Sequence, residues 1–156
     1  MTLRAWRIVK AKHASTAFTG DGAKQFGGRW NSVGVPMIYV SGSISLAMLE
    51  IQVHVELPEL LEKYALIEVG FAKGLMKPLD LSTLPRTWDQ TPPPVLLQQV
   101  GDVWAASGDS AVLRVPSAIV PTEFNYLLSP AHPDFPKVSI GPIHAFRFDA
   151  RLARWR

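Results

Sequence analysis

The chain has 156 residues, of which 47% are hydrophobic and 19% charged, a composition ordinary for one soluble globular domain with a sizeable core. It contains no cysteine, which excludes disulfide bonds and thiolate chemistry. No apolar run approaches the ~20 residues of a membrane-spanning helix, and the N-terminus lacks the apolar stretch of a secretory signal. We expect a single cytoplasmic domain over residues 1–156, with no membrane association.

The net charge of +3 is unevenly distributed along the chain. Lys and Arg concentrate in residues 1–30 and 137–156, where each segment has a single acidic residue, so the middle is net acidic. If the two ends meet in space, they form a positive surface suited to phosphate or an acidic partner; otherwise they are two separate solvated faces. No basic block alternates with aromatic residues, so we expect no direct nucleic-acid binding.

In the first half, alternation over residues 4–9 predicts a strand, and the glycine-rich residues 13–28 predict a loop. Residues 35–40 are short and apolar, as in a buried strand. Ser43 then provides N-cap chemistry for a helix over residues 44–55. In that helix Leu46, Leu49 and Val53 form one apolar stripe, and Glu50 lies on the adjacent one.

In the second half, residues 65–71 read as a strand and the proline-rich residues 74–94 as an irregular connection. A helix begins near Pro94, with Leu97, Val100 and Trp104 on one face. Residues 111–115 predict a strand, residues 124–128 one helical turn, and residues 144–148 a last strand, followed by a short helix capped by Asp149. The fold class is α+β, a mostly antiparallel central sheet with few helices.

Several common motifs are missing. The glycines around residues 20–28 lack the Lys and hydroxyl residue of a phosphate loop and the spacing of a dinucleotide fingerprint. The four histidines are scattered, so we expect no metal site, and no serine-hydrolase elbow is present. A glycosidase-like pair of Glu50 with a distant acid stays open.

Four residues remain as candidates, each with a plain structural alternative. Glu50 adjoins apolar residues, where a carboxylate needs a partner, although an exposed glutamate is the commoner case. Arg29 follows two glycines and suits either a phosphate or a salt bridge, for example with Glu50. Tyr39 at a strand end suits stacking on a flat ring or a place in the core. Ser117, in a proline-stiffened segment, either presents its hydroxyl or serves a turn.

Together these residues resemble the RES domain, the toxin of bacterial toxin–antitoxin pairs, named for an arginine, a glutamate and a serine. The similarity covers most of the chain, roughly residues 6–148. Its motifs are Gly27-Gly28-Arg29-Trp30-Asn31, Leu49-Glu50, Pro116-Ser117-Ala118 and Glu123-Phe124-Asn125.

The resemblance implies an ADP-ribosyltransferase-like fold and a chemistry that destroys NAD+, which is a substrate rather than a resident cofactor. It assigns catalytic roles to Arg29, Tyr39, Glu50 and, as the most plausible serine, Ser117. The serines near the site in sequence, Ser41, Ser43 and Ser45, stay open as alternatives. Arg29 and Tyr39 would also bind NAD+, together with Trp30, Asn31 and Asn125. It also implies an antitoxin partner of the Xre helix-turn-helix type.

On this hypothesis Glu50 stabilises the cationic ribose, Arg29 holds the diphosphate, Tyr39 stacks on nicotinamide and Ser117 anchors a hydroxyl or phosphate. The acceptor stays open between water, inorganic phosphate as co-substrate, and a protein side chain. The rival hypotheses are an RNA-cleaving toxin and a non-catalytic binding module.

Overall fold

A seven-stranded sheet of order β4-β5-β6-β2-β1-β3-β7 forms the centre of the computed structural model, which describes residues 1–154. All neighbouring strands are antiparallel except β4 and β5. The strands are β1 (Thr2–Lys10), β2 (Ile38–Ser41), β3 (Tyr64–Ala72), β4 (Met76–Pro78), β5 (Val112–Pro116), β6 (Phe124–Leu128) and β7 (Ser139–Phe146). The predicted α+β class with a mostly antiparallel sheet is confirmed.

Helices are short apart from α4. The α-helices are α1 (Asp21–Phe26), α2 (Ile44–Gln52), α3 (Leu57–Leu60) and α4 (Val95–Ser107). The 3-10 helices are η1 (Ala11–Thr16), η2 (Lys73–Leu75), η3 (Leu81–Thr83), η4 (Phe135–Lys137) and η5 (Ala150–Ala153). Among the described residues, no helix is both long and apolar enough to span a bilayer.

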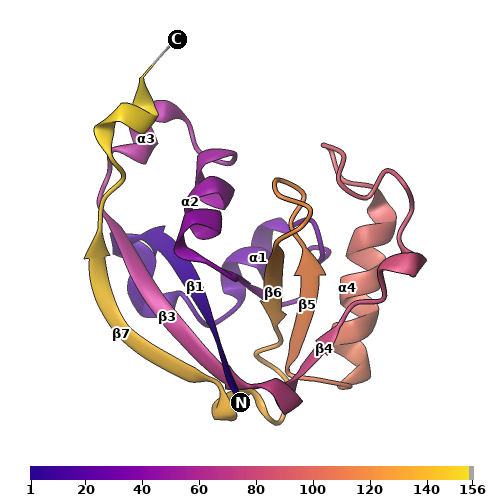
Figure 1. Cartoon of the computed structure of the whole chain (residues 1–156). Helices are drawn as coiled ribbons and strands as arrows, with labels where there is room; N and C mark the ends of the chain where they lie inside the picture. Colours follow the sequence, from indigo (N-terminus) through magenta and orange to yellow (C-terminus); the bar gives the residue numbers. More distant parts are fainter. Residues whose placement is uncertain (155–156) are drawn as a thin grey trace.

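The sheet divides into two halves at the β1–β2 junction. These two strands share one register pair, Trp6 with Ser41, whereas β1 and β3 pair along their full length. Figure 1 shows β1, β3 and β7 on one side and β4, β5 and β6 on the other, with α4 covering the outer face of the second half. Helix α2 lies across the junction and contacts both β1 and β2.

Three apolar clusters hold these parts together. The first lies between the two halves of the sheet and includes Ala5, Ile38, Val69, Phe71 and Val112. The second joins α4 to β5, β6 and the segment before β2 through Trp30, Met37, Leu97, Trp104 and Leu127. The third packs α2 and α3 against β1 and β3, with Phe148 edge-on to Tyr64.

The three predicted helix starts, at Ser43, Pro94 and Asp149, agree with the structure. The Ser43 hydroxyl accepts from the Leu46 amide at 3.0 Å, which caps α2, and Pro94 is the N-cap of α4. Leu97 and Trp104 are buried on the predicted face of α4. Asp149 caps η5 by accepting from the Arg151 amide.

Several predicted elements were wrong. Residues 13–28 are not a plain loop, because they include part of η1 and all of α1, which runs between glycines with positive φ. Residues 124–128 form strand β6, since pairing with both β2 and β5 outweighs the local helical spacing. The irregular connection also contains β4, and the last strand begins earlier, at Ser139.

The apolar stripe predicted for α2 was also partly wrong. Leu46 is buried, but Leu49 and Val53 are 37% and 58% exposed. The helix instead buries Ala47, one turn before Glu50. Helix α2 is therefore rotated so that the Ala47–Glu50 side of the helix faces inward.

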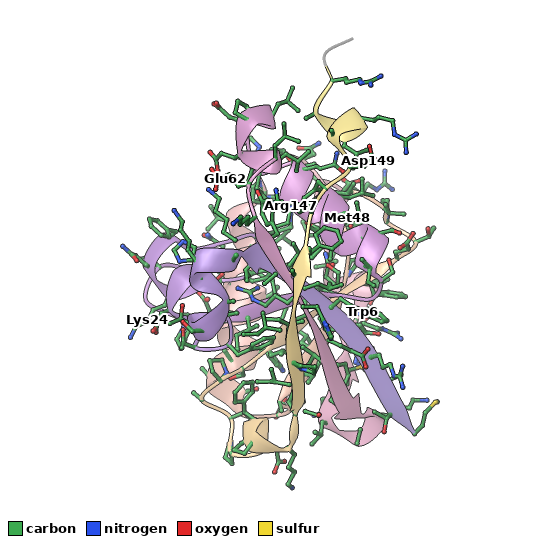
Figure 2. All side chains as sticks on the ribbon, turned by 90° about the vertical axis from the view of Figure 1, so that its left-hand side faces the viewer. Trp6, Lys24, Met48, Glu62, Arg147 and Asp149 are labelled. Atoms are coloured by element: carbon green, nitrogen blue, oxygen red, sulfur yellow. The ribbon has the colours of Figure 1, made fainter. Side chains whose placement is uncertain are left out.

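The two basic ends of the sequence do not form one surface around the cavity described below. Strand β3 separates β1 from β7 in the sheet. Figure 2 shows Arg147 and Asp149 at the end of the molecule where β7 leads towards η5. Of the basic residues in the two end segments, only Arg7 and Arg29 line the cavity in the described part of the chain.

Candidate active site

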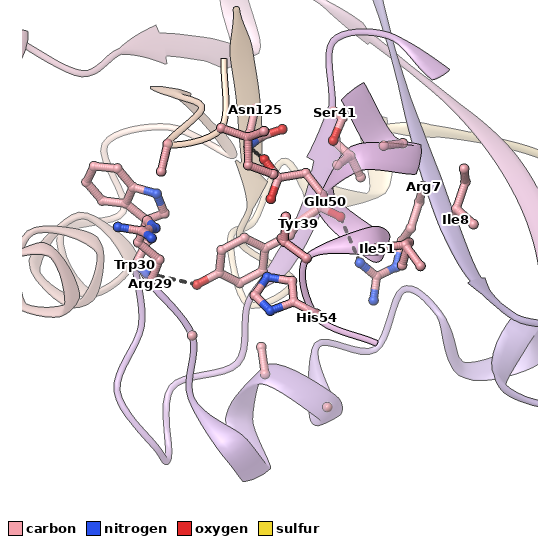
Figure 3. A pocket seen from close by; sticks show the side chains of 18 of the residues that line it. Arg7, Ile8, Arg29, Trp30, Tyr39, Ser41, Glu50, Ile51, His54 and Asn125 are labelled. Carbon is pink, nitrogen blue, oxygen red and sulfur yellow. Dashed lines mark hydrogen bonds between the residues drawn. The ribbon is translucent and has the colours of Figure 1, made fainter. Parts of the chain in front are cut away.

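A cavity of about 530 Å³ opens where β1 and β2 diverge, a size typical of small-molecule sites. Its walls come from strands β1 and β2, helix α2, the α1 segment, and the ends of β5 and β6, together with Thr91. The lining side chains with polar or aromatic chemistry are Trp6, Arg7, Phe26, Arg29, Trp30, Tyr39, Ser41, Glu50, His54, Thr91 and Asn125. Figure 3 shows Arg29 and Arg7 on opposite sides, with Tyr39, Glu50 and His54 between them.

Glu50 projects from the second turn of α2 and is half-buried. Asn125 Nδ2 donates to its Oε1 at 2.7 Å, and the Ser117 hydroxyl donates to the same oxygen at 3.2 Å. Within residues 1–154 no hydrogen bond reaches Glu50 Oε2. One carboxylate oxygen is thus fixed by the protein, and the other remains available to a ligand.

Ser117 does not line the cavity, contrary to the expectation that it touches the substrate. It is fully buried, and the cavity is lined by its neighbours Pro116 and Ala118 instead. Its Oγ accepts from the amides of Ile119 and Val120, both at 3.1 Å, so its single proton is directed to Glu50. The structure places Ser117 behind Glu50, as a group that orients the carboxylate.

Tyr39 presents its ring to the cavity while its hydroxyl is fully engaged. The hydroxyl donates to Asn31 Oδ1 at 2.6 Å and accepts from the Trp30 amide at 3.1 Å. Burial raises the pKa of Tyr39 well above its usual range, against the smaller opposing effect of the Trp30 amide. A neutral phenol with no spare proton suits stacking rather than proton transfer.

Asn31 does not line the cavity. It is fully buried, and its Nδ2 donates to the carbonyls of Ala23, Ser32 and Val35. Its place in the motif therefore has a structural explanation: it joins α1, the loop before β2 and the Tyr39 hydroxyl. Trp30 is also buried, at 2% exposure, but it does reach the cavity wall.

The Gly28–Asn31 segment is held from behind by α4. Gln98 Nε2 donates to the carbonyls of Gly28 and Asn31 at 3.0 and 3.1 Å. A Cβ on Gly28 would lie 2.7 Å from the Tyr39 hydroxyl oxygen, so only glycine permits this approach. The double glycine thus allows the loop to pack on Tyr39 while Arg29 faces the cavity.

Arg29 makes no ion pair with Glu50 among the described residues, contrary to the structural alternative considered for it. Its Nη1 donates to the carbonyls of Trp88 and Gln90, each at 3.0 Å. Burial lowers the pKa of Arg29, and the charges of Glu50 and Asp89 oppose that shift. The guanidinium therefore lies within electrostatic reach of Glu50 without contacting it.

Arg7 is a cavity residue that sequence reasoning did not single out. Its Nη1 donates to the Tyr39 carbonyl at 2.7 Å, bridging the strands where the sheet divides. Its Nε is buried without a hydrogen-bond partner among the described residues, and burial lowers the pKa of Arg7 to about 10. The available signal was an arginine within the first predicted strand. The alternation of side chains along that strand does not tell whether this arginine faces the cavity or the solvent.

A second unsatisfied atom lies beside Glu50. Asn125 Oδ1 is buried and has no partner in the described chain, while its Nδ2 binds Glu50. Unpaired buried polar atoms each cost about 1–3 kcal/mol, so their concentration at one cavity favours a polar ligand there.

His54, on the same side of α2 as Glu50, was likewise missed as a cavity residue. No group of three or more metal-binding side chains occurs in residues 1–154.

Comparison with known proteins identifies the family. The RES domain profile matches residues 4–149, nearly the whole chain. The chain belongs to the RES domain family. The resemblance seen in the sequence motifs is thus confirmed.

Two relatives are similar over almost their full length. A protein named Toxin Res from Photorhabdus laumondii is 39% identical over 150 residues, covering 96% of each chain. A protein named Prs ADP-ribosylating toxin from Sphingobium sp. is 36% identical, covering 99% of each. This RES protein is therefore similar to toxins along its entire length.

The fold is shared with a solved structure. The Mycobacterium tuberculosis MbcT–MbcA toxin–antitoxin complex contains a chain that superposes with a TM-score of 0.79 at 19% identity. The match covers 98% of this chain and 87% of that one. At this identity the likeness establishes the fold.

Proposed function

We propose that this RES protein is the toxin of a toxin–antitoxin pair and that it consumes NAD+ by breaking the nicotinamide–ribose bond. The observation that carries the proposal is the Glu50 carboxylate, held by Ser117 and Asn125 through one oxygen inside a cavity flanked by two arginines. Among the described lining residues, Glu50 is the only acid. Such a cavity suits a ligand that is anionic overall but develops positive charge at one point.

NAD+ has this distribution of charge. Its nicotinamide leaves as a neutral ring, taking the bonding electron pair from the ribose carbon, so no proton need be donated to it. The sugar is left as an oxocarbenium-like cation, which a fixed carboxylate stabilises without reorganising. Glu50 Oε2 would face that sugar and its hydroxyls.

The remaining residues would bind rather than react. Arg29 would bind the diphosphate, because a guanidinium donates several fixed N–H groups to phosphate oxygens. Arg7, on the opposite side of the cavity, would add a second positive charge that favours the anionic substrate. The Tyr39 ring would stack on nicotinamide, and its occupied hydroxyl keeps it out of the proton chemistry. Ser117 and Asn31 would act through Glu50 and Tyr39, which revises the direct contacts expected from the sequence.

The acceptor distinguishes three outcomes. Attack by water releases ADP-ribose, nicotinamide and a proton, whereas attack by inorganic phosphate gives phosphorylated ADP-ribose and nicotinamide. Attack by a protein side chain would leave ADP-ribose on that protein. The name of the Sphingobium relative favours this outcome, ADP-ribosylation of a protein, as the second candidate function. We propose cleavage of NAD+ as the step common to all three.

The test is to incubate the full chain with NAD+, with and without phosphate and with cell extract, and to identify every ribose product by mass spectrometry. Nicotinamide release in any arm supports the proposal, and the product assigns the acceptor. Absence of nicotinamide release in every arm, from folded protein, would refute it.

We also propose an antitoxin partner of the Xre helix-turn-helix type that covers the cavity. The structural neighbour comes from a toxin–antitoxin complex. In this chain Phe26 and Val53 line the cavity yet are 77% and 58% exposed, which provides an apolar rim for a partner. Co-expression with a cognate antitoxin of this type should suppress NAD+ loss, and Phe26→Ser with Val53→Ser should weaken that suppression.

A further inference from the structure

The segment of residues 88–91 is hydrogen-bonded to Arg29 beside the cavity. Arg29 Nη1 donates to the carbonyls of Trp88 and Gln90, and Nη2 donates to the Thr91 hydroxyl at 3.4 Å. Thr91 in turn lines the cavity. One side chain of the motif thus binds three of the four residues of a segment that is about sixty residues away in the sequence.

The donors of Arg29 divide into two groups. A guanidinium carries five N–H bonds: two on each terminal nitrogen and one on Nε. The segment uses both Nη1 protons and one Nη2 proton. Nε–H and the second Nη2 proton form the other edge of the group, and no described residue accepts from that edge. That edge matches two oxygens of a phosphate.

The segment has few other attachments. It belongs to the proline-rich connection between β4 and α4, where most residues are exposed. Its own backbone bonds are short-range turns, from the Trp88 amide to Pro85 and from the Gln90 amide to Thr87. Trp88 packs partly against the α4 cluster, but Asp89 and Gln90 are exposed. Removing the Arg29 bonds therefore leaves the end that reaches the cavity supported by turns alone.

We propose that Arg29 has two functions, one on each edge. Its terminal nitrogens fix residues 88–91 as a wall of the cavity, and its Nε edge binds a diphosphate oxygen pair of the substrate. This inference rests on the proposed NAD+-consuming function for its second half. Because both edges belong to one rigid group, substrate binding and order in the segment stabilise each other.

The first experiment measures amide hydrogen exchange by NMR in the free full-length chain. In Arg29→Lys, which keeps the charge but cannot bridge three positions, the Trp88 and Gln90 amides should exchange at least about tenfold faster. The matched control is Arg86→Lys, the same substitution at an exposed arginine of the same connection. The wall function would be overturned if Trp88 and Gln90 exchanged at the same rate in Arg29→Lys as in wild type. The strand β3 amides, equally protected in Arg29→Lys and wild type, show that the fold is intact.

The second experiment adds ADP-ribose as the probe and follows the same amides. In wild type, saturating ADP-ribose should slow their exchange at least about threefold, and Arg29→Lys should lose most of this slowing. If calorimetry shows binding but the wild-type segment is unaffected, the coupling is wrong. If ADP-ribose and NAD+ both fail to bind wild type, the proposed function fails, and the diphosphate edge with it. The exchange of the free proteins still decides the wall function.

Discussion

Ser117 and Glu50 are 67 residues apart in sequence, and the serine hydroxyl donates to Oε1 of the glutamate. Because two backbone amides donate to the same hydroxyl oxygen, the serine has one proton and one direction in which to give it. The bond therefore orients the carboxylate within the cavity. This relationship explains why a fully buried serine belongs to the same motif set as a cavity glutamate.

Replacing Ser117 with alanine should lower kcat more than it changes KM, because the serine acts on Glu50 and not on the substrate. We expect kcat to fall about tenfold, KM to change no more than about threefold, and stability to drop by about 1–2 kcal/mol. Steady-state kinetics and urea denaturation measure these quantities. The control is Ser110→Ala, a buried serine whose hydroxyl binds Trp104 and the Val112 carbonyl away from the cavity. That variant should lose stability but not kcat, and equal losses of kcat would refute the orienting function.

Glu50→Gln should abolish most of the turnover while keeping the fold. An amide preserves the size of the side chain but cannot offset the charge on the ribose, so nicotinamide release should fall on the order of hundreds-fold. Nicotinamide is quantified by chromatography, with circular dichroism as the check of folding. Glu56→Gln, at the exposed N-cap residue of α3, is the matched control. Near-normal turnover of Glu50→Gln would exclude the electrostatic role.

Arg7→Met should raise the KM for NAD+ because it removes one of the two cavity arginines while keeping an unbranched side chain of similar length. We expect an increase of about tenfold or more, since charge-assisted hydrogen bonds contribute roughly 1.5–3 kcal/mol each. Stability should change little or rise, because the variant no longer buries a charge whose Nε is unpaired. A large loss of stability with an unchanged KM would show that Arg7 serves only to bridge the strands.

Tyr39 predicts a specific dependence of stability on pH. Its pKa in the folded protein is raised by burial, so the folded chain keeps the phenol proton above pH 10 while the unfolded chain, with an ordinary value of about 10, loses it. The stability that Tyr39 contributes is complete below pH 10 and is lost as the pH rises further. The free energy of unfolding of wild type should therefore exceed that of Tyr39→Phe by about 1–2 kcal/mol at pH 8, and this difference should narrow by pH 11. Denaturant unfolding of both proteins measures this difference, and a gap that does not change with pH would contradict the assignment.

Gly101→Ala should displace the Arg29 loop from behind. Gly101 is buried in α4, and a Cβ there would lie 1.7 Å from the Trp30 carbonyl oxygen, so either the helix or the loop must move. We expect a loss of at least about 2 kcal/mol in stability, from an overpacked contact between backbone and helix. Gly74→Ala is the control, since a Cβ at that position has no atom within 4 Å. Equal stability of the two variants in thermal unfolding would show that the helix–loop contact is adaptable.

Local patterns predicted what local chemistry controls. The Ser43 cap, the Pro94 helix start and the buried face of α4 followed from hydrogen-bonding and periodic residues a few positions apart. Strand β6 did not follow, because a five-residue segment with four apolar or aromatic side chains fits one helical turn equally well until β2 and β5 are present to pair with it. Helix α1 was missed since six residues between two glycines have little intrinsic preference.

By itself the sequence determined the α+β class, the main helix starts and, through its motifs, the RES family together with Arg29, Tyr39, Glu50 and Asn125 as residues of one cavity. Only the tertiary structure decided that Ser117 and Asn31 lie behind that cavity and that Arg7 lines it. The physical reason is that exposure, the direction of a hydroxyl proton and the partner of a guanidinium depend on segments far apart in the chain. Such long-range contacts leave no periodicity in the sequence near each residue.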